Sequence, residues 1–285
     1  MRKVAIVVTS TSGIDYLKEA KDVTVARLTV SFDGKEYIDY SEMKAEAFYD
    51  KMLEKPDAPI HTSQVSTGMF TEIYEKIKED GFDELLVVTI SSKLSGTYQG
   101  AILAKDMVDG IKIEVVDSKS VSLGEGLLVL KALDMVKEGK TLDDIVPELE
   151  KFRDKIEIYV LVDTLKYLVK NGRLSSAAGL LGTLLRIKPL LKIMPDGSLQ
   201  PYEKIRTTTK AQKRILELVL SETKDRDPEF FIAYTTNKDK ALEFEKELKA
   251  ANPKAKITLI PLTPVVGAHA GPGTLGIGFY NKKEK

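Results

Sequence analysis

The sequence predicts an α/β protein with two domains. In the first half of the chain, a strand-like apolar run, a polar loop and a helical pattern recur three times. This recurrence favours right-handed βαβ units and a mostly parallel sheet flanked by helices. The second half mixes strands, helices and a hairpin pattern, as an α+β domain does. At 285 residues the chain can form two hydrophobic cores, and we place the domains at residues 1–154 and 155–285.

The strands of the first domain are predicted from apolar runs and from alternation. Residues 3–8 form an apolar run typical of a parallel strand buried on both faces, and the loop Thr9-Ser10-Thr11-Ser12-Gly13 follows it. Residues 24–32 alternate and meet residues 35–38 across Asp33-Gly34, a dipeptide that suits a tight hairpin turn. Further strands are expected at residues 85–90 and 113–116.

The helices of the first domain are predicted from capping residues. Ser41 is a candidate N-cap for the first helix and Ser66 or Thr67 for the second, while Thr141 and Asp144 have the spacing of a capping box. The expected helices span residues 41–54, 68–80, 97–108, 124–138 and 141–152. Because parallel strands end at one edge of a sheet, the loops after residues 8, 90 and 116 should lie together at the edge that binds ligands.

The second domain combines a hairpin with separate strands and helices. Two strand patterns, at residues 190–194 and 199–205, flank Pro195-Asp196-Gly197-Ser198 and predict the hairpin. Further strands are expected at residues 156–162, 230–234, 257–260 and 274–280. Helices are expected at residues 164–170, 175–185, 208–221 and 238–251.

Composition excludes several classes of function. Forty-three basic residues balance forty-three acidic ones, so nothing marks the chain as a nucleic-acid partner. It has no cysteine, and its two histidines lie more than two hundred residues apart, so neither thiolate chemistry nor a metal site is expected. No apolar run approaches the roughly 18 residues of a membrane span. We therefore expect a cytoplasmic protein without stable membrane insertion.

Nucleotide cofactors are not expected either. The sequence contains no phosphate-binding P-loop pattern. Gly271-Pro272-Gly273, followed by Thr274-Leu275-Gly276, has the glycines of a dinucleotide fingerprint but follows a proline and leads into a strand.

Three distant segments combine hydroxyl groups with glycine, namely Thr62-Ser63-Gln64, residues 91–101 (SSKLSGTYQGA) and residues 265–279 (VVGAHAGPGTLGIGF). A polar turn between a strand and a helix presents N–H groups and hydroxyls at the positive end of the helix dipole, which suits an anion. Ser95, Gly96 and Thr97 have that position, although Ser95 or Thr97 could instead cap the helix.

His269 stands in the third segment, where the local pattern does not require an imidazole. Gly267, Gly271 and Gly273 around it indicate a backbone shaped for close approach, although a lone histidine is more often structural. The enzymatic alternative is a serine hydrolase with Ser95 as nucleophile and His269 as base. Ser95 is not in a GxSxG turn, however, and no aspartate is marked as the orienting residue.

Several segments together resemble the DegV family of bacterial fatty acid-binding proteins. They are Thr62-Ser63-Gln64, residues 91–99 (SSKLSGTYQ), Asp117-Ser118, residues 167–175 (YLVKNGRLS), Lys188-Pro189 and residues 269–273 (HAGPG). They occur in family order and span almost the whole chain. The resemblance implies a two-domain carrier that holds one long-chain fatty acid between its domains. It also implies a separate ATP-dependent fatty acid kinase, to which the carrier presents the acid for acyl phosphate formation.

The resemblance also implies roles for individual residues. Thr62, Ser95 and His269 match the residues that bind the fatty acid carboxylate. Further head-group contacts are possible at Ser63, Gly96, Thr97 and Gly267. Arg206 matches a basic residue that contacts the kinase, and is otherwise a solvated arginine at a strand end. Candidates for the tunnel wall, which core packing explains equally well, are Leu180, Leu181, Leu184, Leu185 and Ile187.

One position departs from the family pattern. The family usually has an aspartate followed by serine after the first strand, whereas this chain has Thr9-Ser10. The departure leaves open whether a carboxylate orients the site from this position.

Overall fold

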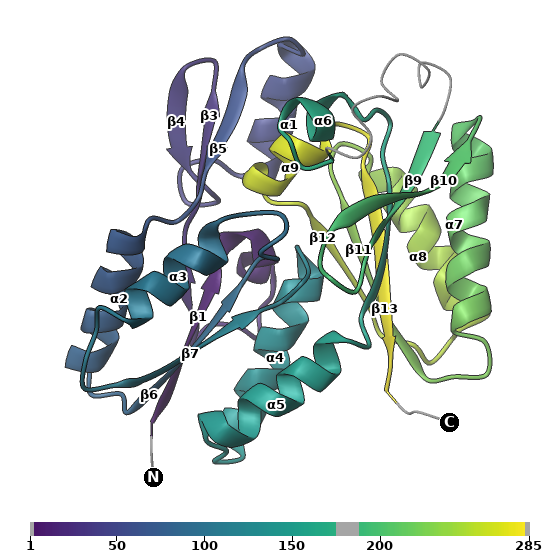
Figure 1. The fold of residues 1–285 in the computed structure, drawn as a ribbon. Helices are drawn as coiled ribbons and strands as arrows, with labels where there is room; N and C mark the ends of the chain where they lie inside the picture. Colours follow the sequence, from purple (N-terminus) through teal and green to yellow (C-terminus); the bar gives the residue numbers. More distant parts are fainter. Residues whose placement is uncertain (1–2, 175–187, 283–285) are drawn as a thin grey trace.

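The computed structural model describes residues 3–174 and 188–282, and its N-terminal half is built on a parallel sheet (Figure 1). The sheet has the order β2-β1-β6-β7, and every neighbouring pair is parallel, as predicted. Its strands are β1 (Val4–Thr9), β2 (Thr24–Ala26), β6 (Glu84–Thr89) and β7 (Lys112–Asp117). All residues of β1 and β6 are buried, which accounts for their continuous apolar runs.

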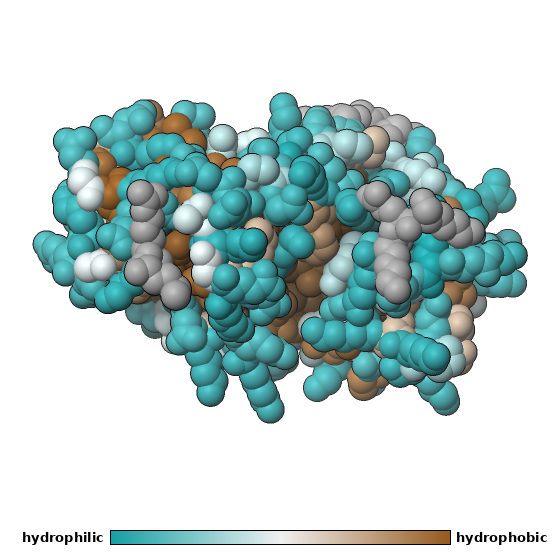
Figure 2. Space-filling model, turned by 90° about the horizontal axis from the view of Figure 1, so that it is seen from below, coloured by the Kyte–Doolittle hydropathy of each residue, from teal (hydrophilic) through white to brown (hydrophobic). Residues whose placement is uncertain are grey.

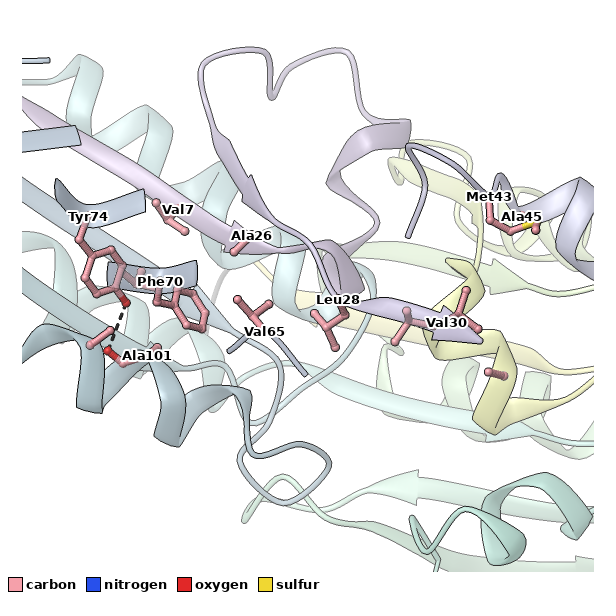
Figure 3. Close-up of a cluster of buried hydrophobic side chains, with 14 of the residues drawn as sticks. Val7, Ala26, Leu28, Val30, Met43, Ala45, Val65, Phe70, Tyr74 and Ala101 are labelled. Carbon is pink, nitrogen blue, oxygen red and sulfur yellow. Dashed lines mark hydrogen bonds between the residues drawn. The ribbon is translucent and has the colours of Figure 1, made fainter. Parts of the chain in front are cut away.

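Helices cover both faces of this sheet. On one face, α2 (Thr67–Glu79) and α3 (Thr97–Lys105) pack against Val7 and its neighbours. On the other face lie α4 (Leu123–Lys137) and α5 (Leu142–Arg153). Figure 3 shows part of the first core, where the Tyr74 hydroxyl donates a hydrogen bond of 3.2 Å to the carbonyl of Ala101. Ser66 caps α2 and Thr141 forms the predicted capping box of α5.

A three-stranded antiparallel sheet of order β4-β3-β5 extends from this half of the molecule. It comprises β3 (Thr29–Phe32), β4 (Lys35–Ile38) and β5 (Ile60–Ser63), with α1 (Ala45–Glu54) beside it. The hairpin at Asp33-Gly34 is confirmed, but residues 24–26 pair with β1 instead. The prediction that α1 begins at Ser41 is wrong, because residues 39–43 form a turn closed by a bridge between Asp39 and Met43.

The C-terminal half contains a six-stranded mixed sheet of order β10-β9-β8-β13-β11-β12. Its strands are β8 (Glu157–Leu161), β9 (Lys188–Ile193), β10 (Leu199–Ile205), β11 (Pro228–Tyr234), β12 (Ile257–Pro261) and β13 (Leu275–Asn281). Only the β11–β12 pair is parallel. The predicted hairpin of β9 and β10 is confirmed. The boundary after residue 154 stays a prediction, although all three sheets keep to their own half of the chain.

One face of the six-stranded sheet packs against helices and the other faces the N-terminal half. Helices α7 (Thr208–Glu222) and α8 (Lys238–Ala251) cover the first face. Side chains of alternate residues, such as Ile158 and Phe231, point the other way and pack with Leu123 of α4. Figure 2 shows apolar residues in the hollow between the two lobes, seen from below.

The described residues also form two short α-helices, α6 (Lys166–Lys170) and α9 (Pro264–Ala270), and two 3-10 helices after β1, η1 (Ser10–Ser12) and η2 (Ile14–Tyr16). The predicted helix at residues 175–185 and the proposed tunnel residues lie outside the described residues; these are Leu180, Leu181, Leu184, Leu185 and Ile187. Within residues 3–174 and 188–282, no helix has both the length and the apolar character of a membrane span.

Candidate functional site

A cavity of about 610 Å³ lies between the two halves of the molecule. Its N-terminal wall is formed by loops that follow the parallel strands and includes Ile90 and Val121. Its C-terminal wall is the face of the six-stranded sheet that is turned toward the N-terminal half, with Val160 and Phe231 among its residues. The predicted edge of the parallel sheet therefore does border a cavity, and its walls are mainly apolar.

Thr62, Ser95 and His269 all line this cavity. Thr62 lies near the end of β5, Ser95 in the loop before α3, and His269 in α9. The Thr62 hydroxyl and His269 Nε2 are 2.8 Å apart and share a hydrogen bond, across 207 positions of sequence. Thr62 and His269 are therefore in direct contact, and Ser95 borders the same cavity.

The Ser95 hydroxyl is positioned by the first residue of α3. It lies 2.9 Å from the hydroxyl of Thr97 and accepts a hydrogen bond of 3.3 Å from the Thr97 N–H group. Thr97 itself is fully buried. The N-cap of α3 is Gly96 and has no side-chain cap, so Ser95 supports the first turn from one residue before the N-cap, and it also borders the cavity.

His269 belongs to a helix that the sequence did not predict. No element was predicted for the glycine-rich segment at residues 265–270, but α9 spans Pro264–Ala270 and has proline in its first turn. Burial, with a smaller contribution from the positive charge of Arg173, lowers the pKa of His269 to about 4. Its imidazole is therefore neutral near pH 7, with Nδ1 unpaired within the described part of the chain.

Arg173 is a cavity residue that the sequence-based prediction did not select. Its Nε donates to the carbonyl of Leu94 at 3.1 Å and its Nη1 to that of Asn171 at 2.6 Å. Burial lowers its pKa, and no carboxylate of residues 3–174 or 188–282 pairs with it. A partly buried guanidinium without an anion is complementary to an anionic ligand. Arg173 lies within YLVKNGRLS, one of the segments that resemble the family, and this was the sequence feature that could have selected it as a site residue.

The remaining predicted contacts differ in their surroundings. Ser63 lines the cavity, whereas Gly96, Thr97, Gly267 and Arg206 are not among the described residues that do. A Cβ atom on Gly96 would lie 2.3 Å from Gln64 Oε1, and one on Gly267 would lie 2.2 Å from the Tyr49 hydroxyl. Both glycines therefore permit close packing around the site. Arg206 is exposed just after β10.

A carboxyl group does lie beside Thr9, although it comes from another element. Glu125 of α4 accepts hydrogen bonds from the hydroxyls of Thr9 and of Thr11, the latter at 2.8 Å. Burial raises the pKa of Glu125 to about 8, so that this carboxyl is protonated near neutral pH. Thr11 also lines the cavity, and it thereby connects the buried carboxyl to the site.

A second buried carboxyl fixes the helix that holds His269. Asp39 accepts hydrogen bonds from the Ser10 hydroxyl at 2.7 Å and from the Val265 N–H group at 3.3 Å. Burial raises its pKa to about 7. Asp39 thus joins the loop after β1 to the beginning of α9.

The arrangement suits anion binding better than acyl hydrolysis. His269 Nε2 bonds to Thr62, and no carboxylate of the described residues orients Nδ1. A histidine with a pKa of about 4 is also a weak general base at neutral pH. No cluster of three or more metal-ligating side chains occurs among the described residues. Hydroxyl groups, an imidazole and a guanidinium beside apolar walls are suited to an anionic head group with an apolar tail.

Comparison with known proteins identifies the family. A family model described as an uncharacterised protein of the DegV family matches residues 3–282. A DegV domain-containing protein of Listeria innocua is 34% identical, with 98% of this chain and 99% of the relative aligned. A fatty acid-binding DegV protein of Thermus thermophilus superposes with a TM-score of 0.89 at 32% identity, covering 99% of this chain and 100% of that one. DegV of Bacillus subtilis, described as a fatty acid binding protein, gives 0.90 at 31% identity with the same coverage. The chain belongs to the DegV family.

Proposed function

We propose that this protein binds one long-chain fatty acid, with the acyl tail in the cavity and the carboxylate at Thr62, Ser95 and His269. The observation that carries the proposal is the hydrogen bond of 2.8 Å between Thr62 and His269, on the border of an apolar cavity. Solved relatives described as fatty acid-binding proteins support it.

The apolar walls account for affinity. A tail of sixteen or eighteen carbons buries about 15 methylene groups at roughly 0.8 kcal/mol each, a gross gain on the order of 12 kcal/mol. Loss of translational freedom and ordering of the tail offset a large part of this gain. The remainder still permits tight binding, so the polar groups are free to determine orientation.

The head-group residues account for orientation. A carboxylate removed from water needs hydrogen bonds or a countercharge. The Ser95 hydroxyl can donate one of those hydrogen bonds. The bonded pair of Thr62 and His269 can donate another, from the Thr62 hydroxyl or from the Nδ1–H group of the neutral imidazole, because one proton of the pair lies between them. Arg173 adds a positive charge on the same cavity, and it has no carboxylate partner among residues 3–174 and 188–282.

The protein acts, in this proposal, as a non-catalytic carrier in the cytoplasm. It presents the carboxylate to a separate fatty acid kinase, which phosphorylates the acid, and Arg206 contacts that kinase. The exposure of Arg206 just after β10 supports a role in contact with another protein. The carrier itself needs no cofactor for this role.

Two measurements test the proposal. Native mass spectrometry of the purified protein should detect one bound fatty acid per chain. Ser95→Ala and His269→Ala should each weaken binding of a fluorescent fatty acid by about 1 to 3 kcal/mol, because each leaves a buried polar group unpaired. Unchanged affinity in both variants contradicts the head-group assignment. Arg206→Ala is the matched control, which should bind the acid normally and lose phosphorylation by the kinase.

A further inference from the structure

The apolar cavity contains a second polar spot, formed by residues outside the proposed head-group set. Thr11 in the loop after β1 and Ser122 in the loop after β7 both line the cavity. The Ser122 N–H group donates to the Thr11 carbonyl at 3.1 Å, so the two residues are neighbours. Apolar Val121 and Ile158 line the same cavity. A plain acyl tail offers these two hydroxyls no hydrogen-bond partner.

The Ser122 hydroxyl has no structural role that accounts for it. Ser122 is 6% exposed, and its Oγ has no hydrogen-bond partner within residues 3–174 and 188–282. It occupies the N-cap position of α4, yet its side chain does not cap that helix. Its backbone also has φ of 57° and ψ of −139°, a conformation that favours glycine. A buried hydroxyl in this state is unfavourable unless a ligand or water completes it.

Thr11 adds a second hydroxyl, which hydrogen bonds to Thr9 and Glu125 hold in place. Its Oγ1 lies 2.8 Å from a Glu125 carboxyl oxygen and 2.8 Å from the Thr9 hydroxyl. Thr11 donates to Glu125, and its oxygen keeps a lone pair that can accept a hydrogen bond from the cavity side. The unpaired Ser122 hydroxyl can supply the donor. The spot therefore offers both donors and acceptors on fixed backbone.

We propose that Ser122 and Thr11 form a second polar subsite, which recognises a hydroxyl group carried along the acyl chain. Hydroxylated long-chain fatty acids are then preferred ligands. The inference rests on the proposed function, because it concerns the same cavity and the same class of ligand. A chain hydroxyl can donate to and accept from these side chains, and so completes Ser122, which a methylene group cannot do.

Stearate and a set of hydroxystearates that differ in the position of the hydroxyl provide the test. Each displaces a fluorescent fatty acid from the full-length protein. In a purely apolar tunnel every hydroxyl weakens binding, because it loses its hydrogen bonds to water. We expect at least one isomer to bind roughly 3- to 10-fold more tightly than stearate, the equivalent of one ordinary hydrogen bond.

Variants assign the gain to the subsite. Ser122→Ala should abolish the preference for the hydroxylated isomer. Ser122→Gly should do the same while relaxing the backbone, which keeps the test valid if the alanine variant folds poorly. Ser120→Ala is the matched control, since it removes another buried, unpaired hydroxyl from the same loop that does not line the cavity. It should retain the preference.

The possible failures are distinguishable. If stearate binds and no isomer binds more tightly, or if the gain persists in both Ser122 variants, the subsite is overturned and fatty acid binding stands. If neither stearate nor any hydroxystearate binds, the fatty acid proposal fails and the subsite fails with it.

Discussion

Acid should destabilise the ligand-free protein through His269. Burial holds its pKa at about 4 in the folded state, against the ordinary value of 6.5 in the unfolded chain. As pH falls below 6.5, His269 becomes protonated in the unfolded chain but stays neutral in the folded protein until the pH approaches 4. Protonation therefore favours the unfolded state. The interval spans roughly 2.5 pH units, and at about 1.4 kcal/mol per unit the folded state loses about 3 kcal/mol by pH 4.

Two buried carboxyls act in the opposite direction, so the experiment must isolate the histidine. The pKa values of Asp39 and Glu125 are raised to about 7 and 8. Their contribution to stability is fully present below the ordinary carboxyl pKa and is lost as pH rises toward these values. A His269→Gln variant retains both carboxyls, so the difference between wild type and variant reports the histidine alone.

Urea unfolding of both proteins between pH 7 and pH 4 provides the measurement. The free energy of unfolding of the wild type should fall relative to that of His269→Gln by about 3 kcal/mol across this range. A difference between the two proteins that stays constant from pH 7 to pH 4 refutes the assignment of a buried, neutral imidazole.

Three further predictions concern residues around the site. Glu125→Gln cannot ionise, so the wild type should lose stability relative to it in urea as pH rises from 4.5 toward 8, and parallel profiles contradict this. Gly267→Ala places a Cβ atom 2.2 Å from the Tyr49 hydroxyl and should cost about 1 to 3 kcal/mol in thermal unfolding, whereas an unchanged melting temperature contradicts the packing argument. Arg173→Gln should weaken fatty acid binding about tenfold in fluorescence titration, and equal affinity excludes its role as countercharge.

The parallel sheet could be predicted because its signals are local. Strands β1 and β6 are buried on both faces and therefore appear as unbroken apolar runs. Helix α9 could not be predicted in this way, because Gly267 lowers the helical propensity of its segment. The helix is stabilised by distant residues, through the contact of Gly267 with Tyr49 and the bond from the Val265 N–H group to Asp39.

The site could be predicted in part, for a related reason. Residue type and family resemblance selected Thr62, Ser95 and His269, and all three line the same cavity, while their role in binding stays a prediction. What distinguishes Arg173 is that its guanidinium bonds to backbone carbonyls and to no carboxylate of the described residues, and what distinguishes Ser122 is a buried hydroxyl without a partner among them. Such features depend on the folded neighbours and cannot be read from the sequence. For Arg173 the sequence offers only its place in the segment YLVKNGRLS, and for Ser122 it offers no comparable signal.

The position of His269 depends on how the two halves of the molecule pack. Helix α9 is attached to the N-terminal half at three points, by Asp39 to the Val265 N–H group, by Tyr49 to the Leu262 carbonyl just before the helix, and by Thr62 to His269 itself. A ligand held by Thr62 and His269 therefore contacts both halves at once. A ligand that binds only the folded state stabilises that state. Fatty acid should therefore raise the stability of the contacts between α9 and the N-terminal half as well as fill the cavity.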